Sequence, residues 1–290
     1  MNKSYLDLVN ECDSSVLGYI PNAIVEKLPW PKDLWEISHE SRSATLLAPH
    51  DATAEQRTAL LAQTLAAAVK ADTFQILRGW RNELYPIYGP GKELLASIER
   101  SGSSLFGIIT YGVHMTAYVK DEIGMRIWVA QRSKTKQTFP GMLDNTVGGG
   151  ISTGEQPFES LVREAIEEAS LPEDLVRVNA KCVGCVTYTY IRDARAGGET
   201  GLLQPECEYV YDLEVDSSVV PTPCDAEVEG FRLYTVDETK AALANGEFKP
   251  NCAIVLIDFF IRHNVITPEN EKDYLEIQAR IHRRHEFPTH

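Results

Sequence analysis

The sequence has 290 residues, 43% hydrophobic and 24% charged, which suffices for one large or two modest domains with hydrophobic cores. Its formal net charge of −14 argues against broad contact with nucleic acid or an anionic membrane, because both favour basic protein surfaces. The charge does not exclude a small ligand that carries phosphate, since a bound metal ion can reverse the local field of clustered carboxylates.

The chain shows no clear targeting or membrane-spanning pattern. Its first residues lack the apolar core of a secretory signal and the Arg- and Ser-rich composition of a transit peptide, and no apolar run reaches 18 residues. The six cysteines are scattered, as is typical of reduced thiols. We therefore predict a cytoplasmic protein. The pair Cys182-x-x-Cys185 lies in a strand-like run and is expected to be buried and structural rather than half of a zinc site.

The N-terminal third ends in a linker-like run. Residues 52–70 have the composition and periodicity of an amphipathic helix, and a shorter helix is expected over residues 92–100. Residues 101–104 read Ser-Gly-Ser-Ser, a composition typical of a boundary between domains. The sequence thus predicts an N-terminal accessory α+β domain over residues 1–104 and a second domain over residues 105–290.

The second part of the chain mixes strand-like and helical segments. Strands are predicted at residues 106–120 and 125–133, joined by a turn at 121–124, and at residues 181–192, 206–215 and 228–236. Helices are predicted at residues 157–170, 237–245, 251–264 and 268–284. Strands and helices in this mixed order indicate an α/β or α+β sandwich.

Residues 148–171, GGGISTGEQPFESLVREAIEEASL, carry the most informative pattern. The glycines allow the backbone to approach a ligand closely, and Pro157 suits the first turn of a helix. Glu164, Glu167 and Glu168 share one face of that helix because they are spaced i, i+3 and i+4. No lysine compensates them, and apolar residues occupy the opposite side. A hard cation with oxygen ligands therefore explains the cluster better than a solvated acidic face.

The spacing Gly149-x5-Glu155-x7-Arg163-Glu164-Ala165-x-Glu167-Glu168 resembles the Nudix box. Ser170 departs from the family pattern, which usually has Gly at this end of the helix; the change puts the local cap geometry in doubt but removes no ligand. The resemblance implies a Nudix α/β/α sandwich that hydrolyses a diphosphate bond in a small molecule.

The resemblance also implies roles for individual residues. The catalytic group would comprise Arg163, Glu164, Glu167 and Glu168. The three glutamates would hold Mg2+ or Mn2+, which neutralises charge on phosphorus and lowers the pKa of an attacking water. Glu155 would form a supporting ion pair with Arg163. No covalent nucleophile is required for this chemistry.

A second acidic pair, Glu206-x-Glu208, lies in a strand-like run, where alternation places both side chains on one face. Two interpretations stay open. The pair lies on an exposed face, or one member completes the metal shell or acts as general base, with Glu208 as the candidate metal ligand. Glu227 and Glu229 form a weaker version of the same pattern.

Two branches of the family resemble parts of the chain. The run TFPGMLDNTVGGG resembles isopentenyl-diphosphate isomerases, but residues 145–149 offer neither the Cys nor the metal-binding His that those enzymes need. The resemblance to fungal and plant Nudix hydrolases labelled thiamine-pyrophosphokinase-related covers nearly the whole chain, including GWRNELYP at residues 79–86. It implies hydrolysis of thiamine diphosphate, and especially of its oxidised or damaged analogues, to the monophosphate.

Candidate substrate residues lie at the loop and in the N-terminal domain. Arg81 would bind a terminal phosphate, and Trp80 and Tyr85 would stack on a heteroaromatic ring, although domain packing also explains the two aromatics. Gly149 and Gly150 would lie against the substrate. His114 is expected to be a satisfied core histidine, and Lys134 and Lys136 to be solvated or a phosphate clamp.

Two other functions stay open. One is a Nudix diphosphatase for nucleoside diphosphate derivatives, which needs the same acidic helix but a different base pocket. The other is a non-catalytic Nudix fold that binds a ligand, which the three intact helix glutamates disfavour. We further predict that residues 1–104 build part of the substrate pocket, since pockets commonly form where domains meet.

Overall fold

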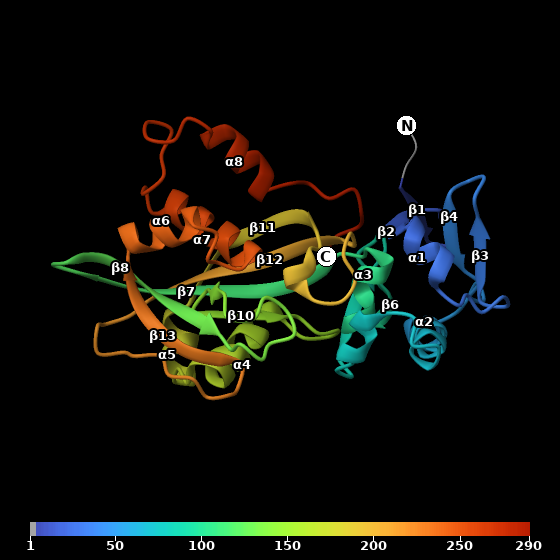
Figure 1. Ribbon diagram of the computed structural model, residues 1–290, viewed down its shortest axis with the longest axis horizontal. Coiled ribbons are helices and arrows are strands. Elements are labelled where there is room, and N and C mark those ends of the chain that lie inside the picture. Colours follow the sequence, from blue (N-terminus) through green and yellow to red (C-terminus); the bar gives the residue numbers. More distant parts are fainter. Residues whose placement is uncertain (1–3) are drawn as a thin grey trace.

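A mixed seven-stranded sheet forms the centre of the C-terminal two thirds of the chain (Figure 1). In the computed structural model, which describes residues 4–290, its strands run in the order β11-β12-β7-β8-β13, with β10 paired to β7 and β9 paired to β8. The strands are β7 (Thr110–Asp121), β8 (Gly124–Arg132), β9 (Leu143–Asp144), β10 (Val147–Gly150), β11 (Lys181–Ile191), β12 (Leu203–Glu214) and β13 (Val228–Thr235).

Helices cover both faces of this sheet. Figure 1 shows α4 (Pro157–Ala169) and α5 (Glu173–Asn179) below it, and α6 (Val236–Ala244) and α7 (Pro250–Arg262) above it. Each layer has its own apolar core, with Leu161 and Ala165 of α4 buried on one side and Phe259 of α7 on the other. The short helix α8 (Tyr274–Ile281) packs near β11. The predicted α/β/α sandwich is confirmed.

The N-terminal part is an additional α+β unit, also as predicted. Its four-stranded sheet has the order β2-β1-β4-β3, and β5 and β6 form a separate hairpin. The strands are β1 (Tyr5–Val9), β2 (Val16–Pro21), β3 (Trp35–Ser38), β4 (Ser43–Leu46), β5 (Leu84–Tyr88) and β6 (Leu94–Glu99). The helices are α1 (Asn22–Lys27), α2 (Ala54–Lys70) and α3 (Ser103–Phe106), and single 3-10 turns are η1 (Gln75–Gly79), η2 (Arg100–Gly102) and, farther on, η3 (Ala194–Ala196).

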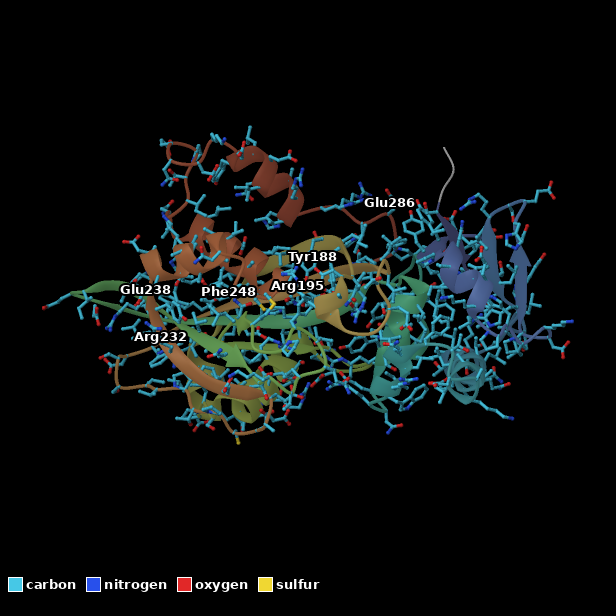
Figure 2. All side chains as sticks on the ribbon, in the orientation of Figure 1. Tyr188, Arg195, Arg232, Glu238, Phe248 and Glu286 are labelled. Atoms are coloured by element: carbon cyan, nitrogen blue, oxygen red, sulfur yellow. The ribbon has the colours of Figure 1, made fainter. Side chains whose placement is uncertain are left out.

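The C-terminal segment connects the two parts. After α8 the chain returns toward the N-terminal part, where the Tyr19 hydroxyl donates to Glu286 (Figure 2). The Phe287 ring contacts the Tyr19 ring edge-on, and the His290 ring stacks on Tyr88 at 4.4 Å. Residues far apart in the sequence thus hold the N-terminal unit against the seven-stranded sheet.

One predicted helix is wrong. Residues 92–100 were expected to be helical, but Leu94–Glu99 form β6, which pairs antiparallel with β5. The side chains of Ala96, Ser97, Ile98 and Glu99 are all buried. Helix propensity is a weak preference, and burial between the hairpin partner and α2 outweighs it here.

The run Ser101–Ser104 is not an exposed linker. All four residues are buried within η2 and α3, and a Cβ at Gly102 would lie 2.7 Å from Leu65 of α2. Small side chains here serve close packing, which the sequence alone does not distinguish from linker flexibility. The domain division near residue 104 stays a prediction.

The prediction for the cysteine pair is also wrong. Cys182 and Cys185 are both exposed, because β11 is an edge strand with a neighbouring strand on one side only, and its pairing with β12 is irregular between Cys182 and Gly184. All six cysteines are free thiols.

Ser170 ends α4 in the left-handed conformation, with φ 51°. L-residues with a Cβ are strained there by about 1–2 kcal/mol, whereas glycine is not, although glycine loses more entropy on folding. We expect Ser170→Gly to stabilise the protein by about 0.5–1 kcal/mol, measured by urea unfolding. Ser170→Ala is the control and should give no gain. A Gly variant no more stable than the Ala variant would show that another contact determines this cap.

Candidate active site

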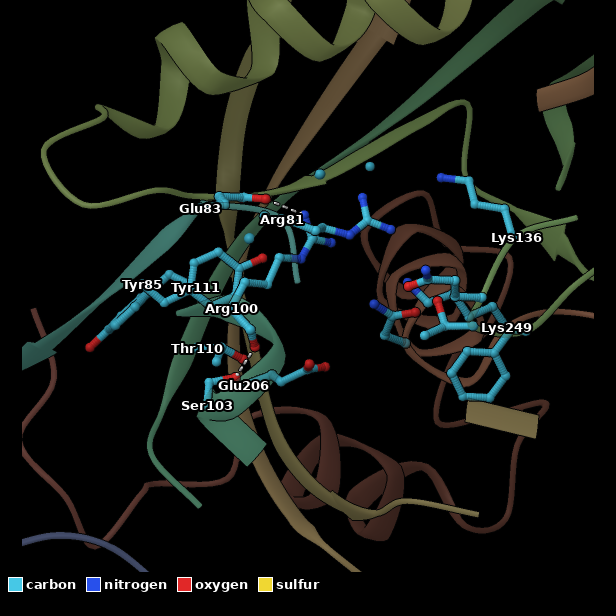
Figure 3. Close-up of a pocket in the computed structure, with 18 of the residues that line it drawn as sticks. Arg81, Glu83, Tyr85, Arg100, Ser103, Thr110, Tyr111, Lys136, Glu206 and Lys249 are labelled. Carbon is cyan, nitrogen blue, oxygen red and sulfur yellow. Dashed lines mark hydrogen bonds and ion pairs between the residues drawn. The ribbon is translucent and has the colours of Figure 1, made fainter. Parts of the chain in front are cut away.

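A cavity of about 650 Å3 lies between the N-terminal unit and the seven-stranded sheet. The N-terminal unit contributes Arg81, Tyr85 and Arg100, which Figure 3 shows opposite Lys136 and Lys249. The remaining wall includes the glycines of β10, the glutamates of α4 and the paired acids of β12. The cavity therefore brings together most of the residues that the sequence singled out.

Trp80 is one exception. It is not one of the residues that line the cavity, its exposed fraction is 38%, and its indole N–H donates to Asn82 at 3.0 Å. Tyr85 is buried and does line the cavity, with the Arg100 guanidinium 5.5 Å from its ring centre. Only one of the two predicted aromatics thus lies at the site.

Glycines allow three side chains to approach the strand backbone. A Cβ at Gly149 would lie 2.2 Å from the carboxyl carbon of Glu164, and one at Gly150 would lie 1.9 Å from the Tyr85 hydroxyl. On β7, a Cβ at Gly112 would lie 2.1 Å from Oε2 of Glu208. Any larger residue at these positions would displace a polar group from the cavity.

The acidic face of α4 is oriented toward these glycines. Oε2 of the buried Glu168 accepts the Gly148 N–H at 3.1 Å. Burial, together with Asp144 and Glu164, raises the pKa of Glu168 to about 8. Burial likewise raises the pKa of Glu164. A nearby cation would hold both groups ionised, and their hard oxygen atoms fit Mg2+ or Mn2+.

Arg163 binds several of the carboxylates at once. Its Nε and a terminal nitrogen donate to Glu155 at 2.9 and 3.2 Å, so the predicted ion pair is present. The other terminal nitrogen donates to Glu164 at 2.8 Å and to Glu167 at 3.1 Å. Arg163 therefore positions the loop against the helix and orients two of the proposed metal ligands.

Glu206 and Glu208 form a buried acidic wall, with exposed fractions of 8% and 5%, so the exposed-face interpretation is wrong. They are buried because β12 lies between β11 and β7. The Tyr188 hydroxyl lies 2.5 Å from Glu206 and 3.1 Å from Glu208. Burial and the neighbouring Glu208 raise the pKa of Glu206 to about 7. Oε2 of Glu208 has no hydrogen-bond partner among the described residues.

The four proposed metal ligands do not form one compact group. Among residues 4–290, no cluster that includes Glu164, Glu167, Glu168 or Glu208 has three ligand atoms all within 4.8 Å of one another. Glu208 lies beside Gly112, whereas Glu164 lies against Gly149. Bringing Glu208 to the same ion as the helix glutamates would require side-chain movement.

His114 is buried, as expected, but it is not fully satisfied. Its Nε2 lies 3.3 Å from the amide nitrogen of Asn251 and 3.8 Å from Glu208, while Nδ1 has no hydrogen-bond partner among the described residues. Although burial opposes it, Glu208 raises the pKa of His114. Sequence reasoning missed Asn251 and Lys249 because only the packing of α7 brings them to the cavity.

The cations around the cavity differ in how firmly they are paired. Lys136 forms an ion pair with Glu227, and Arg100 pairs with Glu83 at 2.8 Å. Among the described residues, Arg81 forms an ion pair with Glu227 alone, at 3.8 Å. Arg81 is therefore weakly restrained by a carboxylate and is available for an anionic ligand. Arg192, which also lines the cavity, donates to Gln204 and to the carbonyl oxygens of Ala196 and Gly197. Lys134 is exposed and does not line the cavity.

Comparison with known families divides the chain near residue 110. The profile of the NUDIX domain matches residues 110–252, and that of the Domain of unknown function (DUF4743) matches residues 9–110. No helix within residues 4–290 is both long and apolar enough to span a membrane.

Several relatives are similar over most of the chain. The uncharacterized protein YJR142W of Saccharomyces cerevisiae is 44% identical over 219 residues, 73% of this chain and 64% of that protein. Nudix hydrolase 20, chloroplastic, of Arabidopsis thaliana is 36% identical over 211 residues, 72% of this chain and 54% of that protein. The chain thus spans less than two thirds of either relative. The cytoplasmic location predicted from the sequence stays a prediction.

A third relative is matched over a larger share of its length. Nudix hydrolase 24, chloroplastic, of Arabidopsis thaliana is 32% identical over 271 residues, which is 93% of this chain and 71% of that protein. The acidic helix, the glycine-rich strand before it and the α/β/α sandwich agree with this similarity. The chain therefore belongs to the Nudix hydrolases, a family that cleaves diphosphate bonds and generally uses divalent metal ions.

Proposed function

We propose that this chain hydrolyses thiamine diphosphate, or its oxidised or damaged analogues, to the monophosphate and phosphate. The observation that carries the proposal is a single cavity that has glutamates of the Nudix helix in one part and a buried acidic pair, Glu206 and Glu208, in another. Such a cavity suits a small substrate that joins a diphosphate to a positively charged ring.

The diphosphate part of the substrate would lie against the helix. Glu164, Glu167 and Glu168 would hold Mg2+ or Mn2+, which when bound lowers the pKa of water and stabilises charge on phosphorus. Arg163 orients two of these carboxylates through bonds of 2.8 and 3.1 Å. Gly149 and Gly150 keep the floor open, and Arg81 supplies a positive charge for the terminal phosphate.

The ring part would lie against the acidic wall. A thiazolium ring carries a permanent positive charge, whereas nucleobases are neutral. A cationic ring would favour the ionised form of Glu206, whose pKa burial and Glu208 raise to about 7. Tyr85 closes the cavity from the N-terminal unit. We keep Glu208 as a candidate fourth oxygen ligand, since its Oε2 has no partner among the described residues.

Hydrolysis then needs no covalent intermediate. Water attacks the terminal phosphorus, the bridging P–O bond breaks, and the products are the monophosphate and inorganic phosphate. A carboxylate of the cavity accepts the proton of the attacking water.

Substrate choice is tested by phosphate release with Mg2+ or Mn2+ from thiamine diphosphate, an oxidised analogue, ADP and GDP. We expect the highest kcat/KM for the thiamine-type compounds. Glu206→Gln should raise KM for them about tenfold, the effect of losing one charged contact, and change ADP hydrolysis much less. Glu229→Gln, on the exposed part of β13, is the matched control.

Two outcomes would overturn the proposal. A wild-type enzyme that prefers ADP or GDP by tenfold would support the alternative of a nucleoside diphosphatase. Binding of these compounds without phosphate release, under either metal, would support a ligand-binding protein instead.

A further inference from the structure

Three metal-binding side chains, none of them on the Nudix helix, meet at the wall of the cavity close to Glu168. His114 lies on β7, Asp144 on β9 and Cys252 in the first turn of α7. One ligand atom from each lies within 4.8 Å of the other two, and all three residues are buried. Within residues 4–290 this is the only such group of His, Cys, Asp or Glu side chains.

The contacts within this group leave one polar atom unused. The Cys252 sulfur lies 2.7 Å from Oδ1 of Asp144, so that pair satisfies itself. Nδ1 of His114 has no hydrogen-bond partner among the described residues, although the side chain is only 3% exposed. Leaving a buried nitrogen without a hydrogen bond is energetically unfavourable. A metal ion bound by the three side chains would remove that cost.

The surroundings hold the three ligands in place. Arg132 donates to Oδ2 of Asp144 at 2.6 Å, which leaves Oδ1 directed at Cys252. On the other edge of the imidazole ring, Nε2 lies 3.8 Å from Glu208, an acceptor for the N–H that a ring bound to metal through Nδ1 carries there. Such outer contacts orient ligands and tune their affinity in metal sites.

Gly148 and the start of α7 shape the positions of two of the ligands. Gly148 faces the imidazole, and a Cβ there would lie 2.8 Å from Nδ1. Cys252 lies at the N-terminal end of the 13-residue helix α7, whose dipole favours a thiolate, whereas burial and the neighbouring Asp144 raise the pKa of the thiol. Arg132 offsets part of the negative charge that a thiolate and Asp144 would carry.

We propose that His114, Asp144 and Cys252 form a zinc site that is separate from the site on the Nudix helix. One nitrogen, one oxygen and one thiolate sulfur match the ligands that Zn2+ prefers, whereas Mg2+ avoids sulfur. Binding would convert the thiol to a zinc thiolate and release its proton to solvent. Water would complete the four-coordinate shell, as in other zinc sites with three protein ligands.

The site would join three segments that are distant in the sequence. Zinc would fix α7, and with it Asn251, to β7 and β9 at the floor of the cavity. Zinc would therefore affect the stability of the protein and the shape of the cavity. Whether zinc binds does not depend on which substrate the enzyme cleaves.

The full-length chain, expressed in zinc-supplemented medium and purified without chelator, tests the proposal by elemental analysis. We expect about one zinc per chain in the wild type and less than a tenth of that in Cys252→Ser. Cys207→Ser, which removes another buried thiol, is the control and should retain zinc. Glu167→Gln should also retain it, because Glu167 lies outside the cluster.

Cobalt provides a second measurement that depends on the thiolate. After replacement of zinc by Co2+, a sulfur-to-cobalt charge-transfer band should appear in the wild type and in Cys207→Ser but not in Cys252→Ser. If Cys252→Ser does not fold, as judged by circular dichroism, His114→Gln replaces it in both measurements. Wild-type protein with only trace zinc and no cobalt band would overturn the proposal, as would a folded ligand variant that binds both metals like the wild type.

Discussion

Glu168→Gln is expected to lower diphosphate hydrolysis by about a hundredfold or more while the protein stays folded. The change removes one negative oxygen ligand but keeps an acceptor for the Gly148 N–H, now 3.1 Å away. Outer contacts of metal ligands alone are worth about 10- to 100-fold, so a ligand should exceed that range. Turnover is measured by phosphate release at saturating Mg2+ or Mn2+.

Although Glu168→Gln lowers activity, it should not lower the stability of the metal-free protein. A residue with a structural role would lose both, so the comparison distinguishes a metal ligand from a structural residue. In the metal-free protein, burial and repulsion by Asp144 and Glu164 disfavour the charged form of Glu168, and an uncharged Gln removes that repulsion. Unfolding with chelator present should therefore show an equal or higher midpoint. Glu159→Gln, on the same helix but paired with Arg177 at the surface, is the control. Activity within a few-fold of wild type would refute the assignment of Glu168 to the metal site.

Arg132→Met is expected to destabilise the protein by about 3–5 kcal/mol, the usual cost of leaving one partner of a buried ion pair uncompensated. Arg132 donates to Asp144 at 2.6 Å and to the carbonyl oxygens of Phe139 and Thr138 at 3.1 and 2.8 Å. Methionine retains the apolar stem but none of these bonds. The free energy of unfolding is measured in urea on chelator-treated protein.

The pH dependence of that loss identifies Asp144 as the group responsible. Burial opposes ionisation of Asp144, but Lys249 and Arg132 together lower its pKa. A carboxyl with a lowered pKa stabilises the fold above its unfolded pKa of about 3.9, and this stabilisation is lost as the pH falls through the folded value. The difference between wild type and Arg132→Met should therefore shrink below about pH 4. Arg280→Ala, which breaks an exposed pair with Glu276, should change stability little at any pH.

Short-range spacing was enough to predict the acidic helix and its ion pair. Glu164, Glu167 and Glu168 lie on one face because a helix repeats every 3.6 residues, and that holds wherever the helix packs. Arg163 of α4 lies eight residues after Glu155, in the loop just before the helix, so their pairing also depends on neighbouring residues. The β7–β8 hairpin follows in the same way from alternation on both sides of a short turn.

Local patterns failed where the neighbouring strand or helix decides the outcome. Residues 94–99 have a helix-compatible composition, yet hydrogen bonding to β5 makes them a strand. Glu206 and Glu208 alternate as they would on any half-exposed strand. They are buried because β12 is an inner strand that β11 and β7 flank, and no feature of residues 203–214 specifies that position.

The sequence by itself thus determined the family, the α/β/α architecture and the helix with its three glutamates. Tertiary structure alone decided that Arg81 and Tyr85 reach the cavity while Trp80 does not. It also decided that His114, Asp144 and Cys252 converge. The physical reason is distance along the chain: helix faces depend on residues three or four apart, whereas these clusters depend on how separate elements pack.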